Sequence, residues 1–492
     1  MPMSVVEGLS PAVVWKRFYE ICQIPRPSKS EERIRLYLRN FGGQNNFAMK
    51  EDKVGNIVIL IPPKPGFENA PTVVLQSHID MVCEKNKESN HDFLQDPLKL
   101  IREGEWIKAD GTTLGADNGI GVAAALAIAN DDSFNHGQLE LLFTVDEETG
   151  LTGVNNLQRS FINGRLLLNL DTEEDGAFYV GCSGGIDSVG RFNIEYDKLQ
   201  DGYMPYNIFV AGLKGGHSGV NIADGRANSI KLLGILLNRM KECNPQYSEI
   251  LGGSKRNAIP REAEAKLFLN PDIESNFREI INEVSIEMSL QFRAADEGIK
   301  ISFEKNNNGI VAKPKVFSNS FSSKIINTIL AMPHGVISMS SSIPDLVETS
   351  TNLATIVMER DKLIIGTSQR SSVESAKKNI AEMVKAIFDL GQAEVITSDG
   401  YPGWQPDIDS DLLKLSKSVF QKLFIKSPEI KAVHAGLECG ILADKYPGIQ
   451  MVSFGPTIEG AHSPDEKVKI VDVDKFYRLL KSILEELAIK NQ

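Results

Sequence analysis

The sequence predicts an α/β protein whose first domain, built on a mostly parallel sheet flanked by helices, is interrupted by an inserted α+β domain. Three observations predict this organisation. Continuous apolar runs, typical of strands buried on both faces, alternate with helical patterns over residues 1–186. Shorter amphipathic segments follow over 187–398. The α/β pattern resumes over 399–492, beginning with the Gly/Pro-rich stretch DGYPGWQPD.

The first part of the α/β domain opens with two helix signals. Ser10 and Pro11 fit an N-cap followed by a first helical position, and Ser28 with Glu31 forms a capping-box pattern ahead of ERIRLYLRNF. Strands and one helix of small residues then alternate. The predicted strands are NIVILI (56–61), TVVLQS (72–77), LELLFTV (139–145) and RLLLNL (165–170), and the helix is GIGVAAALAIAN (119–130).

The insertion carries two strand-and-helix units of comparable size. The first has strands at 206–213, 263–270 and 298–305 and helices at 227–243 and 277–292. The second has strands at 351–360, 362–370 and 393–398 and helices at 322–332 and 373–390. This repetition predicts an insertion made of two similar halves. The returning α/β segment has helices at 412–424 and 473–487 and a strand at 449–455.

Composition excludes several classes of protein. Hydrophobic residues make up 42% of the 492 residues, as in ordinary globular proteins, and the net charge of −12 with no basic stripe argues against nucleic-acid binding. No apolar run approaches the roughly 18 residues that a membrane span requires. The five cysteines are scattered without a CxxC pair, and no secretory signal opens the chain. We therefore expect a cytoplasmic protein with reduced thiols.

Side chains that can bind metal follow the strands of the α/β domain where each strand ends. They are His78 and Asp80 after 72–77, Asp146, Glu147 and Glu148 after 139–145, Asp171 with Glu173 and Glu174 after 165–170, and His462 in the loop after 449–455. Asp117 stands at the start of the helix at 119–130, where the helix dipole favours a carboxylate. Ligand sites in open α/β sheets lie outside the carboxyl ends of the strands, so one crevice could collect these groups.

Each of these residues also has an ordinary structural explanation. Acidic strand ends are usually solvated turns, Asp117 would serve as an N-cap, and His462 could be a plain loop residue. A structural explanation must account for every polar cluster falling at the same edge of one sheet. That coincidence favours a shared site.

The mixture of side chains suits a metal centre. Two histidines and three carboxylates without a thiolate fit one or two divalent cations such as Zn²⁺, Mn²⁺ or Co²⁺. A pair of cations needs a bridging ligand, and the carboxylate of Asp117 on a rigid helix start could supply it. One glutamate of the Glu147–Glu148 pair can bind metal while its neighbour accepts a proton from water. Asp80 can bond the second ring nitrogen of His78 and fix its orientation.

Several motifs resemble, in order and spacing, those of the aminoacyl-histidine dipeptidases (peptidase D, cytosol non-specific dipeptidase). They are SHIDMV, TTLGADNGIG, DEETGLTG, LNLDTEE, GLKGGHSG, RNAIPREA, YPGWQPD, HAGLECG and AHSPDE. This family belongs to the clan of dinuclear zinc aminopeptidases, carboxypeptidases and aminoacylases. The resemblance covers essentially the whole chain, and the motifs together are specific, whereas HID or DEE alone would not be.

The resemblance implies a dinuclear centre, with zinc as the first expectation and cobalt or manganese as alternatives. The implied roles are His78 and Asp171 on one cation, Glu148 and His462 on the other, Asp117 as the bridge, Glu147 as general base and Asp80 as the partner of His78.

The resemblance also implies that the insertion is a lid that supplies substrate contacts. His217 of GGHSG would hydrogen-bond the developing oxyanion, while Asn257 and Arg370 would hold the substrate, Arg370 through its terminal carboxylate. Gly436 would line the substrate pocket, and Glu438 receives no role. Taken without the resemblance, His217 is a tight-turn residue and Arg370 a surface charge at a strand end.

The predicted activity is hydrolysis of unblocked dipeptides, of the Xaa-His type and more broadly. A small peptide is the expected partner, neither nucleic acid nor membrane is expected, and a homodimer is one option for the assembly. The main alternative is an N-acyl amino acid hydrolase of the same clan. A catalytically silent binding protein is less favoured, because the chain keeps every ligand and Glu147. The alternative of a nucleotide-binding enzyme is supported only by the glycine-rich stretch GLKGGHSGV, which lacks the Lys-Ser/Thr ending of a P-loop.

Overall fold

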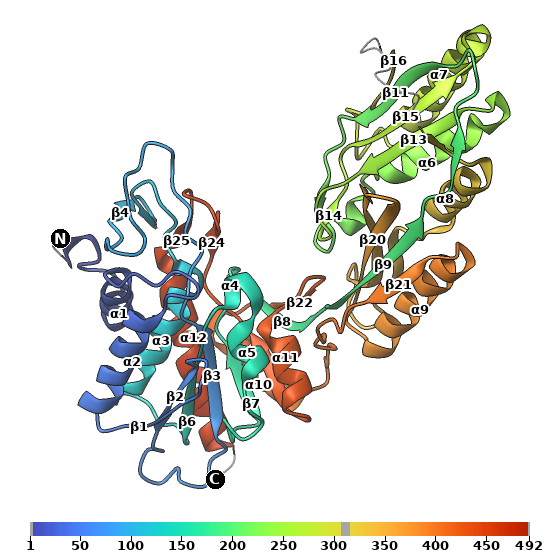
Figure 1. Cartoon of the computed structure of the whole chain (residues 1–492). Helices are drawn as coiled ribbons and strands as arrows, with labels where there is room; N and C mark the ends of the chain where they lie inside the picture. Colours follow the sequence, from blue (N-terminus) through green and yellow to red (C-terminus); the bar gives the residue numbers. More distant parts are fainter. Residues whose placement is uncertain (1–2, 307–314, 491–492) are drawn as a thin grey trace. The chain divides into compact units, whose positions relative to one another are not determined.

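The computed structural model describes residues 3–306 and 315–490, and the chain divides into two compact units (Figure 1). The first comprises Met1–Gly181, Trp404–Ala432 and Leu437–Gln492, and the second comprises Cys182–Gly403 and Val433–Gly436. The chain therefore passes from the first unit to the second between residues 181 and 182 and returns between residues 403 and 404. The sequence predicted these boundaries at 186/187 and 398/399. The assignment of the first unit as catalytic domain and the second as lid stays a prediction.

Residues 433–436 differ from the expected division, because they group with the second unit and not with the returning α/β segment. The backbone N–H of Ser183 accounts for this grouping. It donates to the carbonyl oxygens of Val433 and Ala435 at 3.1 and 3.0 Å. The short segment is thereby tied to the start of the insertion, a long-range contact with no local sequence signal.

The first unit is built on a sheet in the order β1-β2-β6-β3-β7-β23-β8-β22. The strands are β1 (Ala48–Glu51), β2 (Ile57–Ile61), β3 (Val73–His78), β6 (Leu139–Thr144), β7 (Leu166–Asn169), β8 (Ala177–Cys182), β22 (Glu429–Val433) and β23 (Gln450–Ser453). The central strands β6, β3, β7 and β23 run parallel, and β1, β2 and β8 pair antiparallel at the flanks. The predicted α/β class is confirmed, with parallel pairing confined to the centre.

The antiparallel start of the sheet follows from a tight connection. The carboxylate of Asp52 accepts the backbone N–H groups of Val54, Gly55 and Asn56 at 2.9–3.0 Å, which closes a short turn between β1 and β2. A turn this short joins only antiparallel strands. The apolar run at 56–61 did not reveal this, because a fully buried strand reads alike in either direction.

Helices cover the sheet, and β3 and β6 are buried along their whole length. The helices are α1 (Ala12–Cys22), α2 (Glu32–Gln44), α3 (Ala116–Ala129), α4 (Glu147–Gly150), α5 (Thr152–Asn156), α10 (Asp411–Phe424), α11 (Glu438–Lys445) and α12 (Ile470–Ile489). Every residue of α3 except Asp117 is buried. Its small side chains permit close packing, since a Cβ on Gly121 would lie 2.7 Å from the carbonyl oxygen of Leu170.

A four-stranded sheet in the order β24-β25-β5-β4 adjoins these elements. Its strands are β4 (Leu100–Glu103), β5 (Trp106–Ala109), β24 (Ile458–Glu459) and β25 (Lys467–Lys469). β24 and β25 pair antiparallel and hold both ends of the loop that carries His462. β25 also pairs with β5, which precedes the segment leading to Asp117. Residues distant in sequence are therefore connected through one small sheet.

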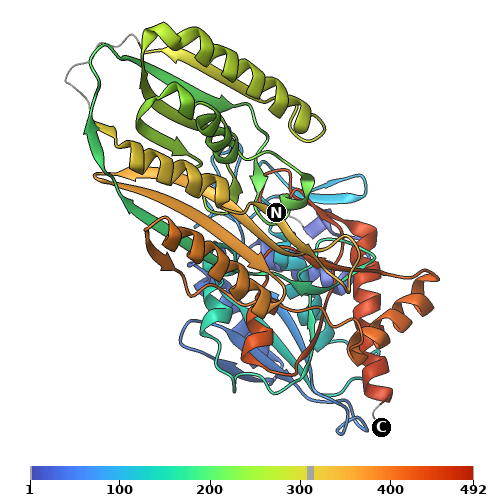
Figure 2. The ribbon, with the colours of Figure 1, turned by 90° about the vertical axis from the view of Figure 1, so that its right-hand side faces the viewer.

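The second unit is a nine-stranded sheet in the order β16-β11-β15-β13-β19-β20-β9-β21, with β18 paired to β19. Its strands are β9 (Gly184–Asn193), β11 (Met204–Ala211), β13 (Gln246–Gly252), β15 (Ala263–Leu269), β16 (Lys300–Lys305), β18 (Gly335–Met339), β19 (Val347–Glu359), β20 (Lys362–Ser371) and β21 (Glu394–Thr397). The helices are α6 (Ser229–Arg239), α7 (Glu274–Gln291), α8 (Asn319–Ala331) and α9 (Glu374–Leu390). Figure 2 shows these helices lying over the strands of the same unit.

The side-chain pattern explains this layering. Tyr206, Ile208 and Val210 alternate along β11 and are buried in a core that includes Leu233 of α6 and Phe277 of α7. β16, β11, β15 and β13 lie on one side of the β13–β19 pair, and β19, β20, β9 and β21 lie on the other. The first group contains the three strands predicted for the first unit of the insertion, and the second group contains those predicted for the second unit together with β9, which precedes both units in the chain. That the two halves are similar stays a prediction.

Shorter elements complete the description. They are β10 (Tyr196–Lys198) paired with β17 (Lys315–Phe317), β12 (Gly216–His217) paired with β14 (Ala258–Ile259), and the 3₁₀ turns η1 (Met3–Val5), η2 (Ile222–Asp224), η3 (Lys241–Cys243) and η4 (Pro271–Ile273). Among the described residues, no helix has the length and apolar character needed to cross a membrane.

Candidate metal centre and substrate-binding residues

Three parallel strands bring the predicted metal-binding side chains to one edge of the first unit's sheet. β3 pairs in parallel with both β6 and β7. His78 is the last residue of β3, Glu147 begins α4 just after β6, and Asp171 follows β7. The carboxyl ends of neighbouring parallel strands lie at the same edge, so side chains from distant parts of the sequence converge there.

The five predicted ligands form two groups that share Asp117. Its Oδ1 lies 3.0 Å from Nε2 of His78, and its Oδ2 lies 3.2 Å from Nε2 of His462. Asp171 Oδ1 is 3.3 Å from the same nitrogen of His78, and Glu148 Oε2 is 3.0 Å from that of His462. Within each group one donor atom per residue lies within 4.8 Å of the others. Asp117 therefore turns one oxygen toward each group, the placement that a bridging ligand needs.

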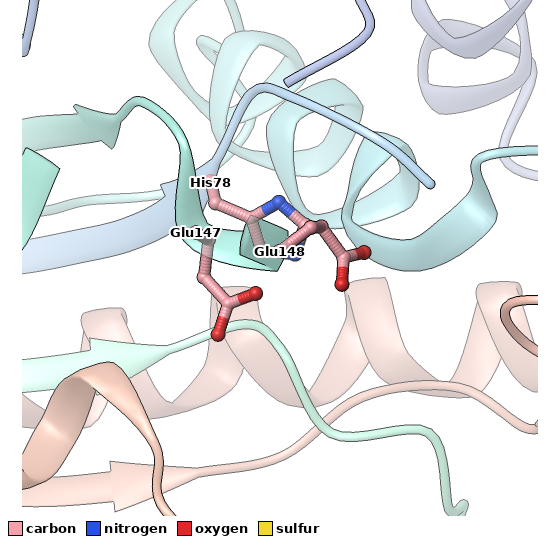
Figure 3. A group of neighbouring side chains, drawn as sticks. All are labelled: His78, Glu147 and Glu148. Carbon is pink, nitrogen blue, oxygen red and sulfur yellow. The ribbon is translucent and has the colours of Figure 1, made fainter. Parts of the chain in front are cut away.

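The side chains of the neighbouring residues Glu147 and Glu148 extend in different directions. Both arise from the turn that starts α4, beside His78, and their carboxylates point different ways (Figure 3). Glu148 is the one whose carboxylate contacts His462. This arrangement suits one glutamate as ligand and the other as proton acceptor, although their catalytic roles stay predictions.

Asp80 holds several parts of the site together. It is fully buried, its Oδ2 accepts the hydroxyl of Ser28 at 2.7 Å, and it accepts the backbone N–H groups of Glu147 and Glu148 at 3.1 and 3.2 Å. Its Oδ1 faces Nδ1 of His78 at 3.4 Å, which is long for a hydrogen bond. Asp80 thus fixes the glutamate turn firmly and the imidazole more loosely.

The electrostatics of the site show an excess of negative charge. Burial disfavours the charged form of His78, yet Asp171, Asp117 and Asp80 outweigh burial and raise its pKa well above the ordinary value. Burial raises the pKa of Glu147 well above its usual range against the opposing effect of His78, and nearby carboxylates add to the rise. These mutually repelling carboxylates create a strong demand for positive charge.

The donor set fits divalent cations. One carboxylate oxygen of Glu148, Oε1, is buried without a hydrogen-bond partner, as expected of an atom that has a metal to bind. The donors are imidazole nitrogens and carboxylate oxygens, which suit zinc and its neighbours in the first transition row. Two three-residue groups around a shared carboxylate match a pair of cations.

In the second unit, β12 and β14 place His217 next to Asn257. His217 pairs with Ala258, and the N–H of Ser218 donates to the carbonyl oxygen of Asn257 at 2.8 Å. Nδ1 of His217 accepts the backbone N–H groups at 219 and 220, at 3.2 and 3.1 Å. Burial and then Arg370 lower the pKa of His217. Hydrogen-bond geometry thus assigns a neutral ring with its proton on Nε2, available to a partner.

Arg370 and Asn257 line one cavity of about 300 Å³ together with Tyr401. The guanidinium of Arg370 donates through Nη1 to the hydroxyl of Tyr401 at 2.7 Å, and its Nε is buried without a partner. Gly436 packs against the same tyrosine, because a Cβ at this position would lie 2.8 Å from the ring. The structure thus groups three of the predicted substrate-binding residues around Tyr401.

The neighbouring His434 leads to a prediction about acid stability. Burial and then Arg370 lower its pKa to about 3, and its Nε2 lies 2.7 Å from the hydroxyl oxygen of Ser350. An unfolded histidine gains its proton near pH 6.5, so between pH 6.5 and 3 the unfolded chain binds more protons and stability falls as the pH falls. We expect His434→Asn to remove this contribution, at most about 1.4 kcal/mol per pH unit.

Hydrogen exchange of second-unit amides at pH 7 and pH 5 measures this effect. The wild type should lose protection between the two values and His434→Asn should lose less, whereas His91→Asn in the first unit should behave as wild type. Equal losses in wild type and His434→Asn would contradict the assignment.

Several residues of the site lie inside the motifs quoted above, but no local pattern predicts what they contact. Glu438, at the start of α11, is almost fully buried and accepts hydrogen bonds from Gln76 Nε2 at 2.5 Å and Thr144 Oγ1 at 2.8 Å. Burial raises its pKa to about 7, against the opposing effect of His78. Tyr401 in YPGWQPD and Glu466 in AHSPDE received no role from the sequence either. Each acts through a partner more than 30 residues away, which no local pattern reveals.

Comparison with known proteins identifies relatives over the full length. The model of peptidase family M20/M25/M40 matches residues 74–486. The chain is 38% identical over 489 residues to the cytosol non-specific dipeptidase of Escherichia coli K12, covering 99% of this chain and 100% of that protein. It is 39% identical to the solved aminoacylhistidine dipeptidase of Vibrio alginolyticus, with a TM-score of 0.91 over 99% of this chain and 98% of that one.

A more distant structure supports the fold alone. The aminopeptidase PepT of Bacillus cereus aligns with a TM-score of 0.57 at 16% identity, over 98% of this chain and 99% of that one. The family match and the full-length relative agree with the geometry of the site. The chain belongs to peptidase family M20/M25/M40.

Proposed function

We propose that this protein is a metal-dependent dipeptidase that hydrolyses unblocked dipeptides, including those of the Xaa-His type. The observation that carries the proposal is the pair of donor groups sharing Asp117, with Glu147 beside them. The names of the dipeptidases from Escherichia coli and Vibrio alginolyticus point to the same substrate class. We propose a cytosolic location, as the name of the former indicates for that protein, and zinc as the resident metal, with cobalt or manganese as alternatives.

In this proposal each ligand has a stated place. His78 and Asp171 would hold one cation, Glu148 and His462 would hold the other, and Asp117 would serve both. Two such cations would supply Lewis-acid polarisation of a carbonyl group and make water more acidic. Glu147 takes the proton of the attacking water and delivers it to the leaving amine nitrogen. Asp80 keeps the Glu147–Glu148 turn and the imidazole of His78 in position.

The second unit supplies the groups that bind the rest of the substrate. The neutral ring of His217 donates its Nε2–H to the carbonyl oxygen as negative charge develops there. Asn257 and Arg370 bind the peptide, with the guanidinium paired to the C-terminal carboxylate. Gly436 borders this region, where its lack of a side chain leaves room for Tyr401. A fixed carboxylate-binding group would reject longer peptides.

Replacing Arg370 tests the carboxylate contact. We expect Arg370→Ala to lower kcat/KM for alanyl-histidine about a hundredfold, because a buried charge-assisted pair is lost. The corresponding dipeptide amide, which has no carboxylate, should lose much less. Arg256→Ala is a matched control, because Arg256 lines the same cavity but pairs with Asp187 at 3.2 Å. Equal losses for the acid and the amide would show that Arg370 does not read the carboxylate.

A substrate panel tests the proposed activity as a whole. Purified protein stripped by a chelator should be inactive and should regain hydrolysis of alanyl-histidine with added Zn²⁺, Co²⁺ or Mn²⁺. Tripeptides and N-acetyl amino acids should be poor substrates. Preference for N-acetyl amino acids would favour the alternative of an N-acyl amino acid hydrolase. Light scattering of the same preparation would test the predicted option of a homodimer.

A further inference from the structure

Glu466 binds the chain segment that leads into Asp117. Only 2% of its surface is exposed, and its carboxylate accepts four consecutive backbone N–H groups. Oε2 accepts those of Leu114 and Gly115 at 2.7 and 2.8 Å, and Oε1 accepts those of Ala116 and Asp117 at 2.7 and 3.2 Å. Asp117 and Asn118 have non-helical backbone angles, so these four N–H groups belong to the segment that leads into the regular turns of α3. Glu466 supplies the acceptors that this segment does not find in a helix.

The opposite side of the same segment is held by Arg26, which is also buried. Its guanidinium donates to the carbonyl oxygen of Gly115, and to those of Ile79 and Asp80 at 3.1 and 2.6 Å. Gly115 has φ of +65°, and a Cβ there would collide with this guanidinium. One side of the segment is thus tied to the end of β3, beside His78, and the other side is tied to Glu466.

Glu466 also fixes the loop of His462, which lies only four residues earlier. The turn between them is closed by the N–H of Glu466 donating to the carbonyl oxygen of Ser463 at 3.1 Å. The side chain of His462 is 54% exposed, whereas those of His78 and Glu148 are 1% and 5% exposed. Packing therefore holds His462 less than the other ligands, and its position depends on the anchoring of its loop.

We propose that Glu466 is a positioning residue that sets the spacing between Asp117 and His462, and through it the affinity of the cation site formed by Asp117, Glu148 and His462. This inference rests on the proposed function. The site of His78 and Asp171 should depend on Glu466 less, because His78 is the last residue of β3 and Asp171 follows β7, so the central strands hold both. Partners behind the ligands typically change metal affinity 10–100-fold when removed.

The test compares two buried glutamates by metal binding. Glu466→Gln keeps the shape of the side chain but turns an amide N–H₂ toward backbone donors. Glu140→Gln is the matched control, because Glu140 is fully buried on β6 and accepts the backbone N–H groups of Asn163 and Gly164 at 2.8 and 3.0 Å, away from the ligands. Chelator-stripped proteins are titrated with Co²⁺ and followed by calorimetry and by the visible absorption of the bound ion.

We expect two cobalt equivalents on the wild type and on Glu140→Gln. Glu466→Gln should retain one equivalent near wild-type affinity and bind the second 10–100-fold more weakly. Two sites of wild-type affinity in Glu466→Gln would overturn the inference and leave the proposed function standing. A wild type that binds no cation would instead overturn the proposed function. Circular dichroism of the stripped proteins checks that each variant folds. If Glu466→Gln does not fold, Glu466→Asp is used in its place. Failure of both Glu466 variants to fold, with Glu140→Gln intact, would make Glu466 a requirement of the fold and also overturn the inference.

Discussion

Replacing Glu147 with glutamine is expected to lower kcat for alanyl-histidine by at least about 10³-fold while leaving the content of bound metal unchanged. A positioned general base typically contributes about 10²–10⁴-fold, and here the same carboxylate must both take and deliver a proton. The amide of glutamine can do neither. Metal content should survive because Glu148, not Glu147, makes the contact with His462. Initial rates and elemental analysis on the same preparation measure the two quantities.

A nearby carboxylate provides the control. Glu174 follows β7, pairs with Lys431 and accepts the hydroxyl of Tyr179 at 2.9 Å, so it lies in the same region without facing the ligands. Glu174→Gln should keep kcat within about twofold, as surface substitutions usually do. Glu147→Ala should resemble Glu147→Gln, since both lack a base. Wild-type turnover in either Glu147 variant would remove the assignment of the base.

The sequence predicts the strand-end residues well because their position follows from two simple rules. A buried parallel strand reads as an apolar run, and the carboxyl ends of such strands share an edge. His78 and Asp171 need no further information to be placed together. Asp117 and His462 are 345 residues apart; the strand-end rule placed them in one crevice, but only the family resemblance implied that both bind the same cation. Their common group is visible in the structure, whereas the identity of the metal and the role of each residue stay predictions.

The residues whose contacts the sequence did not reveal share a physical feature. Glu466 and Tyr401 act through backbone groups or side chains of segments that join them only after folding. A glutamate beside a loop histidine looks like a solvated charge until the four N–H groups that surround it are known. The antiparallel pairing of β2 was hidden for a related reason. Burial determines the composition of a strand, and the neighbouring turn determines its direction.

Asp117→Asn should be the most damaging single change to the metal content. The two oxygens of Asp117 face different histidines, His78 at 3.0 Å and His462 at 3.2 Å, and an asparagine retains only one oxygen. We expect this variant to bind at most one cation equivalent and to lose at least about 10³-fold in kcat, because the two cations no longer share a ligand. Asp171→Asn, which alters only the group of His78, should weaken one equivalent and spare the other.

Comparing these variants distinguishes a ligand that both cations share from a ligand that binds one cation. Asp131→Asn, just beyond the opposite end of α3 and paired with Lys481 at 2.8 Å, controls for the loss of an aspartate near this helix. In a cobalt titration, wild type and Asp131→Asn should bind the most cobalt tightly. Asp171→Asn should bind less, and Asp117→Asn should bind the least. If Asp117→Asn bound two equivalents as tightly as wild type, Asp117 would not bridge. The two donor groups would then be independent sites, and the chemistry would have to be assigned to one cation alone.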